Sequence, residues 1–214
     1  GDPSFVIEAA RADAVRKGIR LEELTIAWMS IEAAVAIIAG IAARSVLLTA
    51  FGVDSVIELL SGVILYRRLK GDSERLEATA TRISAVLLVL LCVYVVATSL
   101  AGLLLRVEPS ESVVGIAVSA VALVAMPLLA RAKRRVNVVL ESPSLRADIA
   151  ETLSCAYLAA VTLAGLVIAG LTGWWWAQYA AAVLLLFWLA PEAREALEEW
   201  RHNWSNHGGK GIDD

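Results

Sequence analysis

Several carboxylates lie inside long apolar segments of this sequence. Asp54 and Glu58 are four residues apart in one apolar block, and Glu151 and Cys155 are four residues apart in another. Residues at this spacing share one face of a helix, so each pair presents its donor atoms together. Carboxylates and a thiolate are metal-ligating groups, and both bind metal only when they are deprotonated. The pattern therefore predicts a metal or proton site inside a membrane.

Two further acids accompany these pairs, Glu32 in the first apolar block and Asp148 one turn before Glu151. A carboxylate in hydrocarbon costs at least about 2.5–3.5 kcal/mol, and we expect no Lys or Arg at a matching depth. A metal cation or protons must then supply the positive charge. Glu32 is open as a proton carrier, a further ligand or a hydrogen-bond acceptor. Asp148 is open as a ligand on the access path, a partner of Arg146 or a backbone cap.

The apolar blocks indicate the elements that hold these residues. The chain has 214 residues, 58% of them hydrophobic, and a mean hydropathy of +0.68. The blocks have the length of about 20 residues that crosses a bilayer as a helix. We therefore predict an all-α membrane protein with six transmembrane helices, at residues 24–43, 45–66, 83–105, 113–130, 143–171 and 174–190. Residues 1–23 form an N-terminal cytoplasmic segment in this prediction, and 191–214 a short cytoplasmic helix and tail.

Some connections carry signals of their own. Residues 4–23 mix apolar and charged side chains and predict a short amphipathic helix on the membrane surface. Residues 131–141 are predicted as a basic connection. Ser142 and Pro143 are typical of the start of a helix, and Pro191 is predicted to open a separate polar helix.

The basic residues predict the orientation. With both termini in the cytoplasm, all of the 19 lysines and arginines except Arg44 and Arg106 lie on the cytoplasmic side, as the positive-inside rule requires. We expect the plasma membrane of a prokaryotic cell. The sequence has no basic stripe with interleaved aromatic residues, so nucleic-acid binding is not expected. It also has no HExxH motif and no Gly-rich phosphate loop, so we do not expect an enzyme.

The two pairs of donors are predicted to lie at similar depths in the membrane. At 1.5 Å per residue, Asp54 and Glu58 lie roughly 12–19 Å from the outer edge of the membrane. Glu151 and Cys155 lie roughly 12–18 Å from the inner edge, so both pairs fall near the midplane of a core about 30 Å thick. Three oxygen ligands and one sulfur favour zinc, and the carboxylates leave manganese or iron open.

Two stretches resemble the cation diffusion facilitator transporters. Residues 45–58 (SVLLTAFGVDSVIE) resemble the second helix of that family, and residues 144–155 (SLRADIAETLSC) resemble its fifth. The resemblance implies a metal site of Asp54, Glu58, Glu151 and Cys155. Family members usually carry His or Asp at the last two positions, and most have a C-terminal cytoplasmic domain. Only about 24 residues follow Pro191, too few for such a domain, so the resemblance is to a branch that lacks it.

The predicted function is divalent metal cation transport. If the family mechanism applies, the protein exports zinc by proton-coupled antiport and alternating access, as a homodimer in the lipid bilayer. Zn²⁺ is the first choice of cargo, followed by Mn²⁺, Fe²⁺, Co²⁺ and Cd²⁺. Two alternatives stay open. One is a membrane metal sensor or accessory subunit without transport, and the other is a monovalent cation/proton antiporter.

Overall fold

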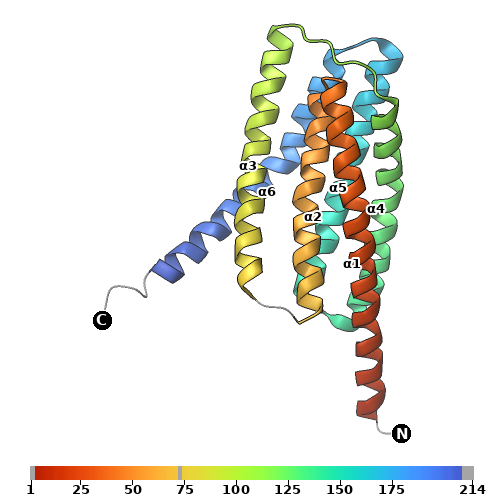
Figure 1. The fold of residues 1–214 in the computed structure, drawn as a ribbon, viewed down its shortest axis with the longest axis vertical. Coiled ribbons are helices and arrows are strands. Elements are labelled where there is room, and N and C mark those ends of the chain that lie inside the picture. Colours follow the sequence, from red (N-terminus) through yellow and green to blue (C-terminus); the bar gives the residue numbers. More distant parts are fainter. Residues whose placement is uncertain (1–2, 72–73, 209–214) are drawn as a thin grey trace.

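The protein is a bundle of helices. The computed structural model describes residues 3–71 and 74–208, and these contain helices and no strand (Figure 1). The helices are α1 (Pro3–Ala42), α2 (Val46–Leu69), α3 (Glu74–Leu104), α4 (Val113–Leu140), α5 (Pro143–Thr172) and α6 (Trp176–Gly208). They alternate in direction along the chain. The tail predicted after residue 208 lies outside the described residues.

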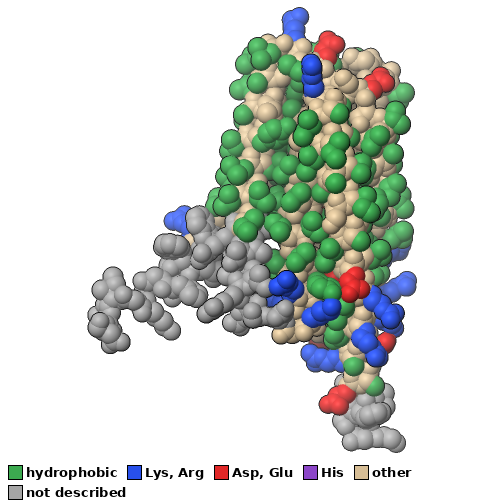
Figure 2. All heavy atoms as spheres, in the orientation of Figure 1, with side chains coloured by type: hydrophobic (Ala, Val, Ile, Leu, Met, Phe, Trp, Pro, Cys, Tyr) green, Lys and Arg blue, Asp and Glu red, His purple; other side chains and the backbone are tan. Residues whose placement is uncertain are grey.

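Most of these helices have the character of membrane spans. Five segments are long and apolar enough to cross a bilayer: Glu8–Ala42, Val46–Leu69, Ala85–Leu104, Val113–Leu140 and Leu145–Thr172. Large apolar side chains such as Ile38, Leu104 and Phe187 face outward, and Figure 2 shows apolar atoms over the length of the bundle. An all-α membrane protein is therefore confirmed. The apolar part of α6 is not among the five segments, so the sixth span stays a prediction.

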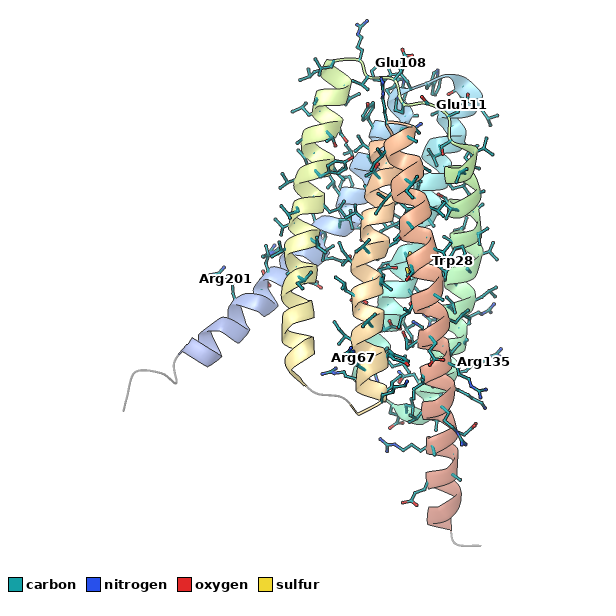
Figure 3. All side chains as sticks on the ribbon, viewed as in Figure 1. Trp28, Arg67, Glu108, Glu111, Arg135 and Arg201 are labelled. Carbon is teal, nitrogen blue, oxygen red and sulfur yellow. The ribbon has the colours of Figure 1, made fainter. Side chains whose placement is uncertain are left out.

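Charged residues gather at the two ends of the bundle. Arg67 and Arg135 lie near the end from which the N-terminal part of α1 projects, and Glu108 and Glu111 lie at the opposite end (Figure 3). Figure 1 shows that the C-terminal part of α6 also extends toward the basic end. Charge at the ends and apolar side chains between them match the polarity profile of a bilayer.

Four helices are clearly longer than the sequence suggested, and one of them is α3, which begins at Glu74 and not at residue 83. α1 is continuous from Pro3, so the prediction of a separate surface helix over residues 4–23 is wrong. No proline interrupts this region, and nothing in it breaks the hydrogen-bond ladder. α4 continues through residues 131–140, so the predicted basic connection is wrong as well. That helix ends at Glu141, whose φ of 50° is left-handed.

Proline does not divide the last helix. α6 continues through Pro191, so the prediction of a separate polar helix beginning there is wrong. Proline inside a helix removes one backbone hydrogen bond, and the helix tolerates this here. The start of α5 is as predicted: Ser142 Oγ accepts a hydrogen bond of 3.3 Å from the backbone N–H of Leu145, and Pro143 occupies the first turn.

α2 lies at the centre of the bundle, where it packs against α1, α3, α5 and α6. Its approach to α1 is close enough to require glycine. A Cβ atom on Gly40 would lie 2.5 Å from Thr49 Oγ1, and one on Gly52 would lie 2.8 Å from the backbone N of Ile37. Small residues at such crossings are the usual means of close packing between membrane helices. The central place of α2 brings its acidic residues against α5 and α6.

Candidate cation-binding site

A cavity of about 430 Å³ lies between α2, α5 and α6. We call it the acidic cavity, because its wall contains five carboxylates: Asp54, Glu58, Glu151, Glu192 and Glu195. Among the described residues that line it, none is basic. Along α2 it extends from Asp54 to Ile64, roughly 15 Å at 1.5 Å per residue. It therefore reaches from the middle of the bundle toward the basic end.

Asp54 is the most deeply buried acid of this cavity. Its exposed fraction is 4%, and its carboxylate has no hydrogen bond or ion pair with any described residue. The charged groups that act on it are themselves acidic, namely Glu192, Glu151 and Glu32. Burying an ionised carboxylate without a partner is costly enough that such a group normally acquires a counter-ion or a proton. Asp54 is thus the residue in the cavity whose environment most requires a positive charge.

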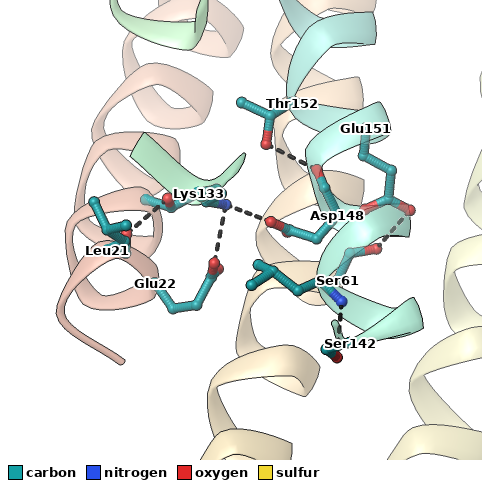
Figure 4. Close-up of polar contacts among 10 residues, drawn as sticks. Leu21, Glu22, Ser61, Lys133, Ser142, Asp148, Glu151 and Thr152 are labelled. Atoms are coloured by element: carbon teal, nitrogen blue, oxygen red, sulfur yellow. Dashed lines mark hydrogen bonds and ion pairs between the residues drawn. The ribbon is translucent and has the colours of Figure 1, made fainter. Parts of the chain in front are cut away.

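Glu58 and Glu151 share the cavity with Asp54. Glu58 lies one helical turn further along α2, and Glu151 reaches the same wall from α5. Ser61 Oγ donates a hydrogen bond of 3.3 Å to Glu151 Oε1, which joins α2 to α5 (Figure 4). The structure therefore places three of the four residues for which the sequence predicted a metal site on the wall of one cavity.

Cys155 is not part of the cavity wall, although it interacts with Glu58. Its side chain is fully buried, does not line the acidic cavity, and donates a 3.7 Å hydrogen bond from Sγ to Glu32 Oε1. Glu32 also accepts hydrogen bonds from Trp28 Nε1 at 2.6 Å and from Ser55 Oγ at 2.7 Å. Of the three roles left open for Glu32, the structure shows the hydrogen-bond acceptor, at a junction of α1, α2 and α5. Trp28, labelled in Figure 3, lies partway along α1.

The acidic side chains of the cavity are not close enough together to form a coordination sphere in this structure. Within the described part of the chain, no three His, Cys, Asp or Glu side chains are grouped closely enough to hold a metal ion. The metal site predicted from Asp54, Glu58, Glu151 and Cys155 stays a prediction. The cavity, at about 430 Å³, has room for several water molecules beside its acidic wall.

A buried ion triad lies beside the cavity. Lys133 Nζ on α4 is 2.5 Å from Asp148 Oδ2 on α5 and 3.0 Å from Glu22 Oε1 on α1 (Figure 4). The exposed fractions of the three side chains are 0% for Lys133, 8% for Asp148 and 0% for Glu22. Of the roles left open for Asp148, the structure shows an ion pair, with Lys133 in place of the expected Arg146.

The triad corrects one step of the sequence argument. We expected no Lys or Arg at a depth that would neutralise the buried acids, and Lys133 neutralises Asp148. The expectation was wrong because α4 continues past residue 130 and carries Lys133 into the bundle. A signal was present: Lys133 follows Ala122, Met126 and Ala130 on the buried face of that helix, at the helical spacing of three or four residues.

Glu192 is the second residue that the sequence reasoning missed. It was assigned to a polar segment after Pro191, whereas the continuous α6 places it on the wall of the acidic cavity. Trp188 Nε1 donates a hydrogen bond of 2.9 Å to Glu192 Oε1. The four-residue spacing of these two side chains on one helix face was the available signal.

The comparisons with known proteins identify no family. No protein-family model matches this chain, and no curated protein matches it significantly.

Proposed function

We propose that this chain is a divalent metal cation transporter of the cation diffusion facilitator type. The observation that supports this most directly is Asp54, a buried carboxylate that has no partner among the described residues and lies on the wall of a cavity of about 430 Å³. Glu58 and Glu151 provide two more carboxylates on the same wall. Intramembrane acids that face a cavity are typical of ion pathways, and a divalent cation compensates more than one of them at a time.

The proposed mechanism follows from the shape of the cavity. In six membrane spans with both termini in the cytoplasm, the basic end is cytoplasmic, and the cavity extends toward that end. The cation enters along Glu195 and Glu192 and reaches Asp54 near the middle of the bundle. Rearrangement of α2 against α5 then exposes the site to the other side. Protons compete for the same carboxylates, because each must be deprotonated to bind metal, and this competition couples release to proton uptake. A homodimer in the lipid bilayer is the expected working form.

Metal flux into sealed proteoliposomes tests the proposal. The purified chain is reconstituted with a metal-sensitive dye inside, and a panel of Zn²⁺, Mn²⁺, Fe²⁺, Co²⁺ and Cd²⁺ is added with and without a pH gradient. We expect saturable uptake that Asp54→Asn and Glu151→Gln reduce to the background of empty vesicles. Glu108→Gln is the matched control, since Glu108 is an exposed acid at the opposite end of the bundle (Figure 3). Uptake that survives the neutralisation of both Asp54 and Glu151 would exclude this mechanism.

A proton-coupled carrier of monovalent cations is the second candidate. It is favoured by the absence, within the described residues, of three grouped metal-ligating side chains. One or two carboxylates in an aqueous cavity suffice for such a carrier. The same vesicles distinguish the two candidates: uptake of Na⁺ or K⁺ in exchange for protons, without uptake of any divalent cation, would support the second.

A further inference from the structure

The α6 side of the acidic cavity carries a carboxylate that is held in place. Trp188 Nε1 donates a hydrogen bond to Glu192 Oε1 at 2.9 Å, and the Trp188 ring lies against Tyr157 of α5, with ring centroids 5.0 Å apart. Ser154, also on the cavity wall, interacts with the same carboxylate. Glu192 is therefore positioned by its neighbours and does not depend on a cation to order it.

The sulfur of Cys155 lies off the cavity wall, where it interacts with both Glu32 and Glu58. The Cys155 side chain has an exposed fraction of 0% and donates to Glu32. Among the described residues, the donors that line the cavity are the carboxylates of Asp54, Glu58, Glu151, Glu192 and Glu195 and the hydroxyls of Ser61 and Ser154. All of these donor atoms are oxygen.

The kind of donor and the size of the cavity together indicate the kind of cation. Carboxylate, hydroxyl and water oxygens suit Mg²⁺, Ca²⁺ and Mn²⁺, whereas thiolate and imidazole donors favour zinc and softer metals. A water molecule occupies about 30 Å³ in the liquid, so a cavity of about 430 Å³ has room for an ion with several waters. The carboxylates are also too far apart to replace a whole hydration shell, since no three of the described ligand-type side chains are grouped.

A second observation separates this cavity from an ordinary surface cluster of acids. Asp54 lines it with an exposed fraction of 4% and has no hydrogen bond or ion pair within the described residues. A buried carboxylate of this kind requires a positive partner, and the cavity that it faces provides the path for one.

We propose that Glu192 belongs to the cation-binding set in place of Cys155, and that the cargo is an oxygen-preferring divalent cation such as Mn²⁺, bound with part of its hydration shell. This inference rests on the proposed transport function and specifies its substrate class. In this binding set Cys155 does not determine metal selectivity, and α6 contributes a ligand directly.

Equilibrium binding of Mn²⁺ to the full chain in lipid nanodiscs is the test, with free Mn²⁺ quantified by its electron paramagnetic resonance signal. We expect the unaltered protein to bind Mn²⁺ and Asp54→Asn to lose that binding. Glu192→Gln should weaken binding about tenfold or more, the scale on which even outer-shell partners of a metal act, and Glu192→Asp should recover part of the loss. Cys155→Ala should bind like the unaltered protein. Glu198→Gln is the control on the same helix, because Glu198 pairs with exposed Arg194 and lies outside the cavity wall.

The outcomes separate this inference from the proposed function. Metal binding that disappears in Asp54→Asn but is unchanged in Glu192→Gln would overturn the inference and leave the proposed function standing. The same holds if Cd²⁺ binds far more tightly than Mn²⁺ and loses its advantage in Cys155→Ala. No binding of any divalent cation to the unaltered protein would overturn both.

A measurement on the unaltered protein covers the case in which Glu192→Gln fails to fold. Pulsed electron paramagnetic resonance of bound Mn²⁺ in deuterated water reports the water molecules on the ion. We expect deuterium coupling from coordinated water. A bound ion without coordinated water would overturn the partly hydrated site.

Discussion

The Nζ atom of Lys133 lies 2.5 Å from Oδ2 of Asp148, and the two side chains join α4 to α5 one helical turn from Glu151. Glu22 of α1 completes the triad, with Oε1 3.0 Å from the same Nζ atom. The two carboxylates therefore share one ammonium group. Three helices thus depend on one buried ammonium group.

We predict that Lys133→Met destabilises the protein strongly. Removing one partner of a buried ion pair leaves an uncompensated charge and typically costs about 3–5 kcal/mol, and here two carboxylates lose their partner. The free energy of unfolding in mixed micelles containing increasing SDS measures the effect. Adding Glu22→Gln and Asp148→Asn to Lys133→Met should restore much of the stability, because the triad is then neutral throughout. A single variant as stable as the unaltered chain would show that the triad carries no structural role.

At Asp54 we expect a substitution to increase the stability of the protein, in contrast to Lys133→Met. Because its carboxylate has no partner, Asp54→Asn should raise the free energy of unfolding of the metal-free protein by about 1–3 kcal/mol, since the amide carries no charge to bury whereas an ionised carboxylate does. The same substitution should abolish metal binding, so that function and stability change in opposite directions. SDS unfolding with and without a chelator measures both effects. Asp13→Asn serves as the control, since Asp13 is exposed and pairs with Lys17 at the surface. A loss of stability at Asp54 would indicate a partner that the geometry does not provide.

The crossing of α1 and α2 gives a third prediction. Gly40→Ala should destabilise the bundle by about 1–3 kcal/mol through overpacking, because the new methyl group would lie 2.5 Å from Thr49 Oγ1 and 2.6 Å from the Thr49 backbone N. Gly170→Ala is the matched control on α5, where the nearest atoms to a new Cβ lie at 4.0 Å. At that exposed position alanine should be neutral or stabilising, through its higher helix propensity. Thermal unfolding of both variants in the same detergent distinguishes packing from propensity.

Thiol labelling tests whether water reaches position 61 on the cavity wall and is excluded from Cys155. In a Cys92→Ala background, we expect a water-soluble maleimide to modify the Ser61→Cys variant, because position 61 lines the acidic cavity. The native Cys155 should resist the same reagent, since its side chain is fully buried and bonded to Glu32. Intact-protein mass spectrometry counts the labels over time. Faster labelling of Cys155 than of position 61 would contradict the assignment of the cavity wall.

Much of the architecture is encoded in local patterns of the chain. The apolar blocks set the helices because a bilayer-length run of such residues has no stable alternative to a helix in lipid. The cap at Ser142 and the turn at Gly173, with its φ of 70°, are likewise local, since each depends on a few neighbouring atoms. The acids Asp54, Glu58 and Glu151 stand out in the sequence alone, because charge is costly in an apolar segment wherever the other helices lie.

The tertiary structure decided which of these groups meet. Cys155 shares a helix face with Glu151 in the sequence, yet the packing of α5 against its neighbours keeps the thiol off the cavity wall, where it interacts with Glu32 and Glu58. Lys133 and Glu192 each lie beyond a boundary that the sequence suggested, and the continuity of α4 and α6 brings them into the bundle. The partner of a buried polar group is chosen across helices, by packing at distances of a few ångströms, and helical periodicity within one segment does not contain that information.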